Sequence, residues 1–116
     1  MNMTRSLQLL LIGFAALAVL SLCSLKSARA QVAASSAEVR IDNFTFNAPS
    51  ITIPVGSEVT WVNRDDIPHT VVSEDQLFKS KGLDTDDKFT YKFTQAGVYK
   101  YFCSLHPKMT AQVVVR

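Results

Sequence analysis

The segment CSLHPKM, at residues 103–109, places a thiol, an imidazole and a thioether at even intervals of three residues. Cys103, His106 and Met109 lie between a segment that alternates like a β-strand and a final valine-rich segment. A loop that returns between two adjacent strands can direct side chains at such a spacing toward one point. The chain's other histidine, His69, follows a proline-containing loop. Because strand ends cluster at the two poles of a β-sandwich, His69 can reach the same point from across the sheets.

Two imidazoles, one thiolate and one thioether discriminate between metal ions. Calcium and magnesium prefer oxygen ligands, and structural zinc prefers Cys and His ligands to a thioether. Two His and one Cys with a weak axial Met are typical of copper electron-transfer centres, because sulfur ligands suit Cu(I) and imidazole suits both oxidation states. Taken singly, each residue has an ordinary interpretation as core or loop. Taken together, the four residues predict a mononuclear copper site.

A segment typical of export precedes this candidate site. It consists of Arg5, an unbroken apolar run over residues 9–20 and the small-residue segment ARA at residues 28–30. This pattern predicts a secretory signal peptide over residues 1–30 that is removed in the mature protein. The apolar run is short for a membrane-spanning helix, which needs roughly 20 residues. If the leader were retained, the protein would be anchored to the membrane.

Removal of residues 1–30 leaves 86 residues, enough for one small domain. The precursor has 12 Lys+Arg and 10 Asp+Glu, but three of the basic residues lie in the leader, so the mature net charge is near −1. No basic patch interleaved with aromatics is present in the sequence, which argues against nucleic-acid binding. Cys103 is the only cysteine after residue 30, so it is a buried thiol, an intermolecular bridge or a ligand.

The mature chain alternates between apolar and polar residues in short segments separated by turn residues. Residues 31–37 are small and polar and predict a flexible lead-in, and residues 74–87 are polar and acidic and predict a long loop. Residues 38–116 are expected to form one all-β domain, a β-sandwich of about seven to eight strands. The predicted strands cover residues 38–42, 51–55, 58–63, 69–72, 88–94, 98–103 and 111–116.

Three stretches carry a resemblance to a known family: VTWVNRDDIPHTVV at 59–72, FTYKFTQAGVYKYFCSLHPKM at 89–109 and the final valine strand. From residue 39 to residue 116 the sequence resembles the small cupredoxins, which are type 1 blue copper proteins. Within that family it most resembles the amicyanin and plastocyanin-like group, and its tight Cys-x-x-His-x-x-Met loop resembles that of amicyanin. The resemblance implies a Greek-key β-sandwich, a periplasmic location and one copper ion that cycles between Cu(I) and Cu(II). The ligands that it implies are His69, Cys103, His106 and Met109.

The resemblance also implies roles for residues around the ligands. His106 is expected to be the partly exposed ligand through which electrons enter and leave. The Thr70 amide is a candidate donor to the Cys103 sulfur, and Asn63 either pins the ligand loops or is a simple turn residue. An apolar rim around His106 is either ordinary loop packing or a docking surface for transient redox partners. Its expected members are Ile67, Pro68, Leu105 and Pro107.

The ligand loop departs from the amicyanin pattern at three positions. Leu105 stands where a proline is typical, Lys108 where an apolar aromatic is typical, and Ala111 where a glycine is common. These changes leave the four ligands in place but alter the expected docking face. A methylamine-oxidising partner is therefore not carried over to this chain.

The sequence predicts a one-electron carrier and not an enzyme. Four protein ligands fill the expected site, whereas an enzyme usually keeps an open coordination position, and no nucleophile–base pair stands out. The alternative is a periplasmic copper carrier or resistance protein that transfers the ion itself, although the sequence lacks Met- and His-rich tracts outside the cluster. A purely structural sandwich with an incidental thiol is a third interpretation. A shuttle between redox partners is expected to be a monomer.

Overall fold

The computed structural model describes residues 35–116, and the expected leader over residues 1–30 lies outside the described part. Within the described residues, no helix is long and apolar enough to cross a membrane. All regular elements there are β-strands. The strands are β1 (Ser36–Asp42), β2 (Thr45–Phe46), β3 (Ser50–Ile53), β4 (Glu58–Asn63), β5 (Val72–Ser73), β6 (Lys88–Lys92), β7 (Gly97–Phe102) and β8 (Thr110–Val115).

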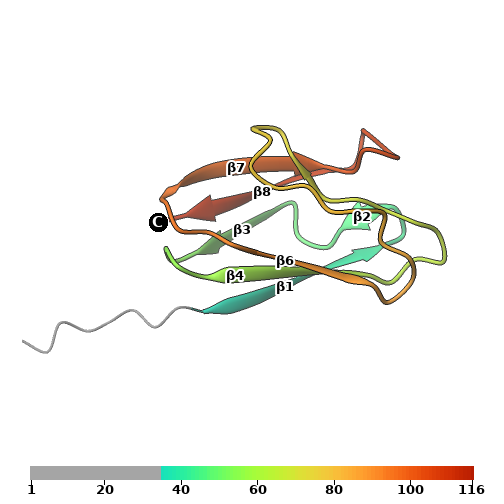
Figure 1. Ribbon diagram of the computed structural model, residues 1–116, viewed down its shortest axis with the longest axis horizontal. Coiled ribbons are helices and arrows are strands. Elements are labelled where there is room, and N and C mark those ends of the chain that lie inside the picture. The colour runs from blue at the N-terminus through green and yellow to red at the C-terminus, as the bar shows by residue number, and fades with distance from the viewer. Residues whose placement is uncertain (1–34) are drawn as a thin grey trace, which may run out of the picture. The chain divides into compact units, whose positions relative to one another are not determined.

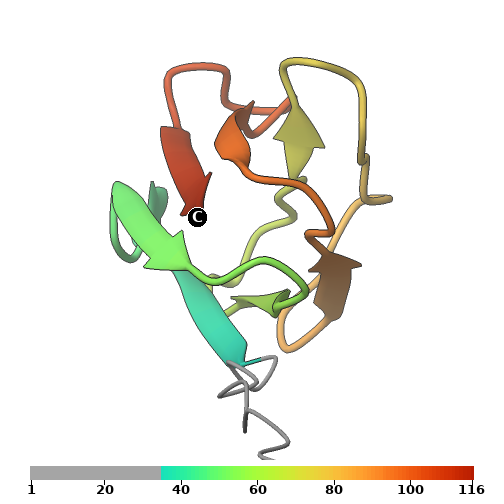
Figure 2. The same cartoon turned by 90° about the vertical axis from the view of Figure 1, so that its left-hand side faces the viewer.

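The strands form two four-stranded sheets, in the orders β2-β1-β4-β6 and β3-β8-β7-β5. Figure 1 shows the two sheets facing each other as layers, and Figure 2 shows β8 (red) and β1 (teal) in different layers. β1 pairs with β4 and β3 pairs with β8 in parallel, while the remaining pairs are antiparallel. The predicted all-β, Greek-key β-sandwich of about seven to eight strands is confirmed.

The core lies between the sheets, as the alternation of the sequence predicts. Successive side chains of a strand point to opposite faces, so every second residue can be buried. Val39 and Ile41 of β1 and Val59 and Trp61 of β4 are all 0% exposed. Tyr101 of β7 packs edge-on against Trp61 from the opposite sheet, with ring centroids 5.3 Å apart. Burying a large apolar side chain contributes roughly 1.5–3 kcal/mol, so this core supplies most of the domain's stability.

Two strand boundaries differ from the sequence prediction. β1 begins at Ser36, which pairs with Glu58, so the last two residues of the expected lead-in belong to the sheet. The strand expected over residues 69–72 is shorter and shifted, because β5 covers only Val72–Ser73. His69 forms an isolated bridge with Leu83 instead, which leaves it outside the sheet that contains β5.

The expected loop over residues 74–87 is better anchored than its polar composition suggested. Phe78 and Leu83 are buried in the core, at 5% and 1% exposure. The Ser80 hydroxyl accepts a hydrogen bond from the Val71 amide at 2.8 Å and donates one to the Lys81 carbonyl. The segment therefore covers one side of the sandwich and places Leu83 beside His69.

Candidate metal centre

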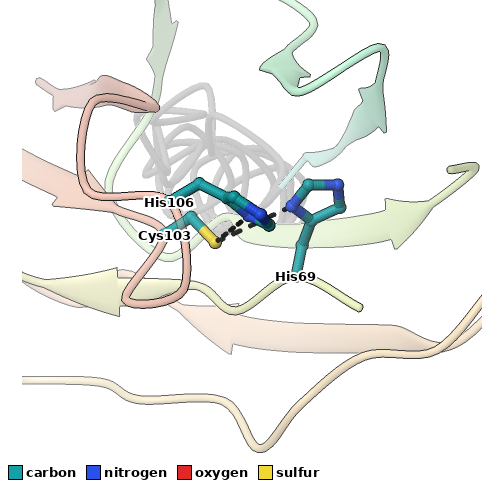
Figure 3. A group of neighbouring side chains, drawn as sticks. All are labelled: His69, Cys103 and His106. Atoms are coloured by element: carbon teal, nitrogen blue, oxygen red, sulfur yellow. Dashed lines mark hydrogen bonds between the residues drawn. The ribbon is translucent and has the colours of Figure 1, made fainter. Parts of the chain in front are cut away.

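Three of the four predicted ligands converge at one pole of the sandwich. The Cys103 sulfur lies 3.7 Å from Nδ1 of His69 and 3.7 Å from Nδ1 of His106. One potential ligand atom from each of the three residues lies within 4.8 Å of the others. Figure 3 shows both imidazole rings directing a nitrogen toward the sulfur. His69 and Cys103 are fully buried, whereas His106 is half-buried, as expected for a partly exposed ligand.

The backbone of the 103–109 loop explains the three-residue spacing. The His106 amide donates to the Cys103 carbonyl at 3.2 Å, and the Met109 amide donates to the His106 carbonyl at 2.9 Å. The Cys103 amide donates to the Met109 carbonyl at 3.1 Å and closes the loop. Two successive turns thus return the chain to the same side every three residues. Met109 is buried at the end of this loop, with 7% of its surface exposed.

His69 lies on a segment that Asn63 ties down. Asn63 is fully buried at the end of β4, and its side-chain nitrogen donates to the carbonyls of Ile67 and Leu83 at 2.8 Å each. Its side-chain oxygen accepts a hydrogen bond from the Asp65 amide at 2.9 Å. His69 and Leu83 also exchange backbone hydrogen bonds of 3.1 and 2.7 Å. The interpretation of Asn63 as the residue that pins this ligand segment is therefore confirmed.

Asp65 orients the His69 ring, a role that the sequence analysis missed. Its carboxylate oxygen lies 2.7 Å from Nε2 of His69. Because a carboxylate only accepts hydrogen bonds, Nε2 carries the proton and Nδ1 keeps its lone pair facing Cys103. The carboxylate also accepts hydrogen bonds from the amides of Asn43 and Phe44, at 2.6 and 3.0 Å. The four-residue interval between Asp65 and His69 in the loop was the only sequence signal.

The charge state of Asp65 is consistent with this arrangement. Burial raises the pKa of its carboxyl, but the hydrogen bonds from Phe44, Asn43 and His69 together outweigh that effect. The pKa of Asp65 therefore lies below its ordinary value of 3.8. Asp65 is thus a stable acceptor for His69 at neutral pH.

Thr70 links the two ligand-bearing segments. Its amide donates to the Cys103 sulfur at 3.4 Å, which confirms the expected donor to this atom. Its hydroxyl oxygen accepts a hydrogen bond from the Ser104 amide at 2.7 Å and lies 2.7 Å from the Ser104 hydroxyl. These hydrogen bonds hold the Cys103 sulfur in position beside the His69 segment.

The predicted rim residues are at least partly exposed, and one aromatic residue that the sequence analysis did not include lies against both imidazoles. Phe44, on the turn between β1 and β2, is 51% exposed and contacts both imidazoles edge-on. Leu105 is 53% exposed beside His106. Of the other rim residues, Ile67 is half-buried and Pro68 and Pro107 are exposed.

The chemistry of the gathered groups fits copper. Two imidazole nitrogens and one thiol sulfur surround a common point, and a thioether lies in the same short loop. This set contains no oxygen donor, so it disfavours calcium and magnesium. It also has only one thiol and includes a thioether, which is a poor match to structural zinc. Soft sulfur combined with imidazole is the donor set that favours copper.

Comparison with known proteins agrees with this geometry. Residues 13–115 match the model of the cupredoxin-like domain. The chain is 34% identical over 110 residues to amicyanin-alpha of Methylorubrum extorquens, covering 90% of this chain and 92% of the relative. A solved structure of a purple cupredoxin from Nitrosopumilus maritimus superposes with a TM-score of 0.66 at 37% identity, over 69% of this chain and 99% of that one.

A solved amicyanin variant in its Cu(I) form is also similar, with a TM-score of 0.65 and 31% identity over 70% of this chain and 82% of that one. The sequence match, the sandwich and the two histidines around a buried cysteine lead to one assignment. This chain belongs to the family of cupredoxin-like domain proteins.

Proposed function

We propose that the protein is a periplasmic one-electron carrier with a mononuclear type 1 copper site. Its proposed ligands are His69, Cys103, His106 and Met109. The observation that carries the proposal is the convergence of both Nδ1 atoms on the buried Cys103 sulfur, each at 3.7 Å. Bound copper would supply the one-electron couple, accepting an electron as Cu(II) and giving it up as Cu(I).

The residues around the proposed ligands support electron transfer over catalysis. Asp65 holds one imidazole, and the backbone turns of the 103–109 loop hold the other, so the ligand positions are set by the fold. A fixed geometry keeps the structural change between oxidation states small. Four protein ligands would leave no open coordination position for a substrate, so we propose a carrier and not an enzyme.

The rim around His106 supports transient docking of redox partner proteins. Phe44 and Leu105 are each about half exposed, and Lys108 adds an exposed positive charge to the same loop as Leu105. A small apolar patch suits brief encounters, because interfaces of electron-transfer proteins lie at the low end of buried area. The donor and acceptor would reach His106 through this rim, and the protein would act as a monomer.

The proposed organisation of the chain follows from the same function. Residues 1–30 would be a cleaved leader that directs the protein to the periplasm, and a retained leader would anchor it to the membrane. Residues 31–37 would be a lead-in whose last two residues join β1. Residues 38–116 would carry the copper-binding domain.

A periplasmic copper carrier or resistance protein is the second candidate function. Such a protein transfers the ion itself and needs ligands that a partner can reach and exchange. Here His69 and Cys103 are each 0% exposed, which disfavours exchange of the ion. The rate of Cu(I) transfer to a competing chelator separates the two candidates, since slow release supports the electron carrier and rapid release supports the copper carrier.

The visible absorption spectrum tests the proposed copper site most directly. One equivalent of Cu(II) is added to the purified protein and, in parallel, to the Cys103→Ser variant, which keeps the side chain's size. An intense thiolate band that ascorbate bleaches and that the variant lacks is the expected result. A pale complex that the substitution leaves unchanged would refute a thiolate-bound copper and with it the electron-carrier proposal.

A further inference from the structure

The turn that joins β1 and β2 has an unusual residue at its second position. Asn43 and Phe44 form a two-residue loop, with φ angles of 51° and 56°. Two positive φ values are the pattern of a type I′ hairpin turn, for which Asn-Gly is the favoured sequence. Asn adopts this conformation readily, whereas a bulky residue does so rarely. Glycine would satisfy the backbone better than Phe44, so the phenyl ring needs another explanation.

The hydrophobic core does not explain the ring. Phe44 is 51% exposed, while its neighbour Phe46, two residues on, is 3% exposed and packs against Tyr101. The chain has therefore placed Phe46, and not Phe44, in the interior.

The contacts of Phe44 are with the two histidines of the proposed metal centre. Its ring centroid lies 5.6 Å from that of His69 at an interplanar angle of 89°, and 5.1 Å from that of His106 at 85°. These are edge-to-face arrangements within the favourable range for aromatic pairs. The two imidazole centroids are themselves 5.0 Å apart, so the three rings form one cluster.

Asp65 fixes the position of this ring relative to the metal centre. One carboxylate accepts the amides of Asn43 and Phe44 and lies 2.7 Å from Nε2 of His69. The turn and the buried ligand therefore share a single anchor. His106 has no equivalent hydrogen bond from its Nε2 to any residue in the described range 35–116. The ring contact with Phe44 therefore takes the place of such a hydrogen bond in restraining the His106 imidazole.

We propose that Phe44 is a positioning residue for the metal centre, whose ring fixes the orientation of the His69 and His106 imidazoles. This inference rests on the proposed function only in that the imidazoles hold copper. Phe44 occupies a backbone position better suited to glycine, and the function of its ring there is to restrain the half-exposed His106. Without this ring, only the 103–109 loop would hold His106 in place.

Substitution of Phe44 by glycine separates the effect of the aromatic ring from the effect of the strained backbone conformation. Phe44→Gly removes the ring and relieves the positive φ, so the metal-free protein should unfold at the same temperature as the wild type or higher. Phe44→Leu keeps an apolar side chain without the aromatic edge, and Phe44→Tyr keeps the ring. Leu77→Ala is the matched control, because Leu77 is 53% exposed on the segment between β5 and β6.

With copper bound, the expected results are spectroscopic and kinetic. Phe44→Gly and Phe44→Leu should change the intensity ratio of the visible bands and release Cu(I) to a chelator on the order of tenfold faster, because residues that orient metal ligands contribute this much to affinity. Phe44→Tyr and Leu77→Ala should retain wild-type values. Wild-type band ratios and release rates in both Phe44→Gly and Phe44→Leu would overturn the inference.

The metal-free protein provides an independent measurement. Nuclear Overhauser contacts from the imidazole ring protons to residues other than Phe44 should change between the wild type and Phe44→Gly at both histidines, and Phe44→Tyr should restore them. Unchanged contacts would overturn the positioning role. If the wild type binds copper without a thiolate band, the proposed function fails, and these contacts still decide whether Phe44 orients the rings.

Discussion

The two segments that carry the histidines are held in place by different means. Residues 63–70 depend on distant parts of the chain. The Leu83 backbone bonds to His69 and to the Asn63 side chain. Asp65, which holds the ring of His69, is itself bonded by the amides of Asn43 and Phe44. Residues 103–109 close on themselves through three backbone hydrogen bonds. The backbone of the first segment therefore depends on the whole fold, whereas the backbone of the second is closed mainly by its own residues, with Thr70 as its contact to the first.

This difference assigns separate roles to the two imidazoles. His69 is 0% exposed and has an oriented ring, so it provides a fixed reference point for the centre. His106 is half-buried on the short loop, where an approaching protein can contact it. Thr70 joins the two segments by bonding to Cys103 and Ser104. A centre built in this way combines one rigid side with one accessible side.

Removal of the Asn63 side chain should have the largest effect on stability. Asn63→Ala removes the side-chain hydrogen bonds to the Ile67 and Leu83 carbonyls and from the Asp65 amide, so we expect the free energy of unfolding to fall by about 2–4 kcal/mol. Urea unfolding of the metal-free protein measures this change. Asn47→Ala, at an exposed position, should cost less than about 0.5 kcal/mol. Equal losses in the two variants would mean that the Asn63 side chain does not hold residues 63–70 in place.

Alkaline pH should lower the stability of the protein through Tyr101, which lies on β7, the strand that leads into residues 103–109. Burial raises the pKa of Tyr101 on β7 to about 12, against a smaller lowering by the Trp61 side chain. Because an unfolded tyrosine ionises near pH 10, the native state should lose stability as pH rises from about 10 to 12, by about 2–3 kcal/mol in full. Urea midpoints across this range should fall more for the wild type than for Tyr101→Phe. Parallel profiles would show that Tyr101 ionises equally well in the folded protein.

Removal of the Thr70 hydroxyl, which links the two segments, should have a smaller effect on the free energy of unfolding. Thr70→Val keeps the shape of the side chain but removes the hydroxyl that contacts Ser104, so we expect a loss of about 1–2 kcal/mol in unfolding free energy. Thr60→Val is the control, since the Thr60 hydroxyl bonds to Thr90 on the exposed face of the sheet at 2.8 Å. Chemical denaturation of both variants makes the comparison. A loss no greater than that of the control would mean that the segments are held independently.

The exposed tip of the 103–109 loop should tolerate change best. Leu105 is 53% exposed, so Leu105→Ala should alter the free energy of unfolding by less than about 0.5 kcal/mol. Thermal unfolding and the visible spectrum of the copper-loaded variant check this expectation. A large loss of stability, or a shifted spectrum, would show that the loop depends on its tip as well as on its backbone turns.

The sequence predicted the strands and the ligand cluster because both leave local signals. Alternation identified β4 at its observed bounds, and the three-residue spacing of Cys103, His106 and Met109 corresponds to the two backbone turns of one loop. Thr70 and Asn63 were identified through the resemblance to cupredoxins. These features each depend on residues close together in the sequence or on a family pattern.

The features that sequence analysis missed depend on long-range contacts. The predicted strand over residues 38–42 ends before Phe44, and a two-residue turn at Asn43 and Phe44 reverses the chain and places the Phe44 ring against both imidazoles. The role of Asp65 depends on backbone amides that lie 21 and 22 residues away in the sequence. The acidic composition of segment 74–87 gave no indication that Leu83 pairs with His69. This isolated bridge takes the place of the first part of the strand expected over residues 69–72.

The parallel pairing of β3 with β8 has a consequence for how the protein folds. Ser50 pairs with Gln112, so the second sheet acquires its edge strand only when the last strand of the chain has joined it. Such long-range pairing is slow to form, because the loop-closure entropy is lost before the contacts are gained. The 103–109 loop leads directly into β8, so the loop and the sheet should close together. We therefore expect the complete set of metal-binding residues to come together only at the end of folding.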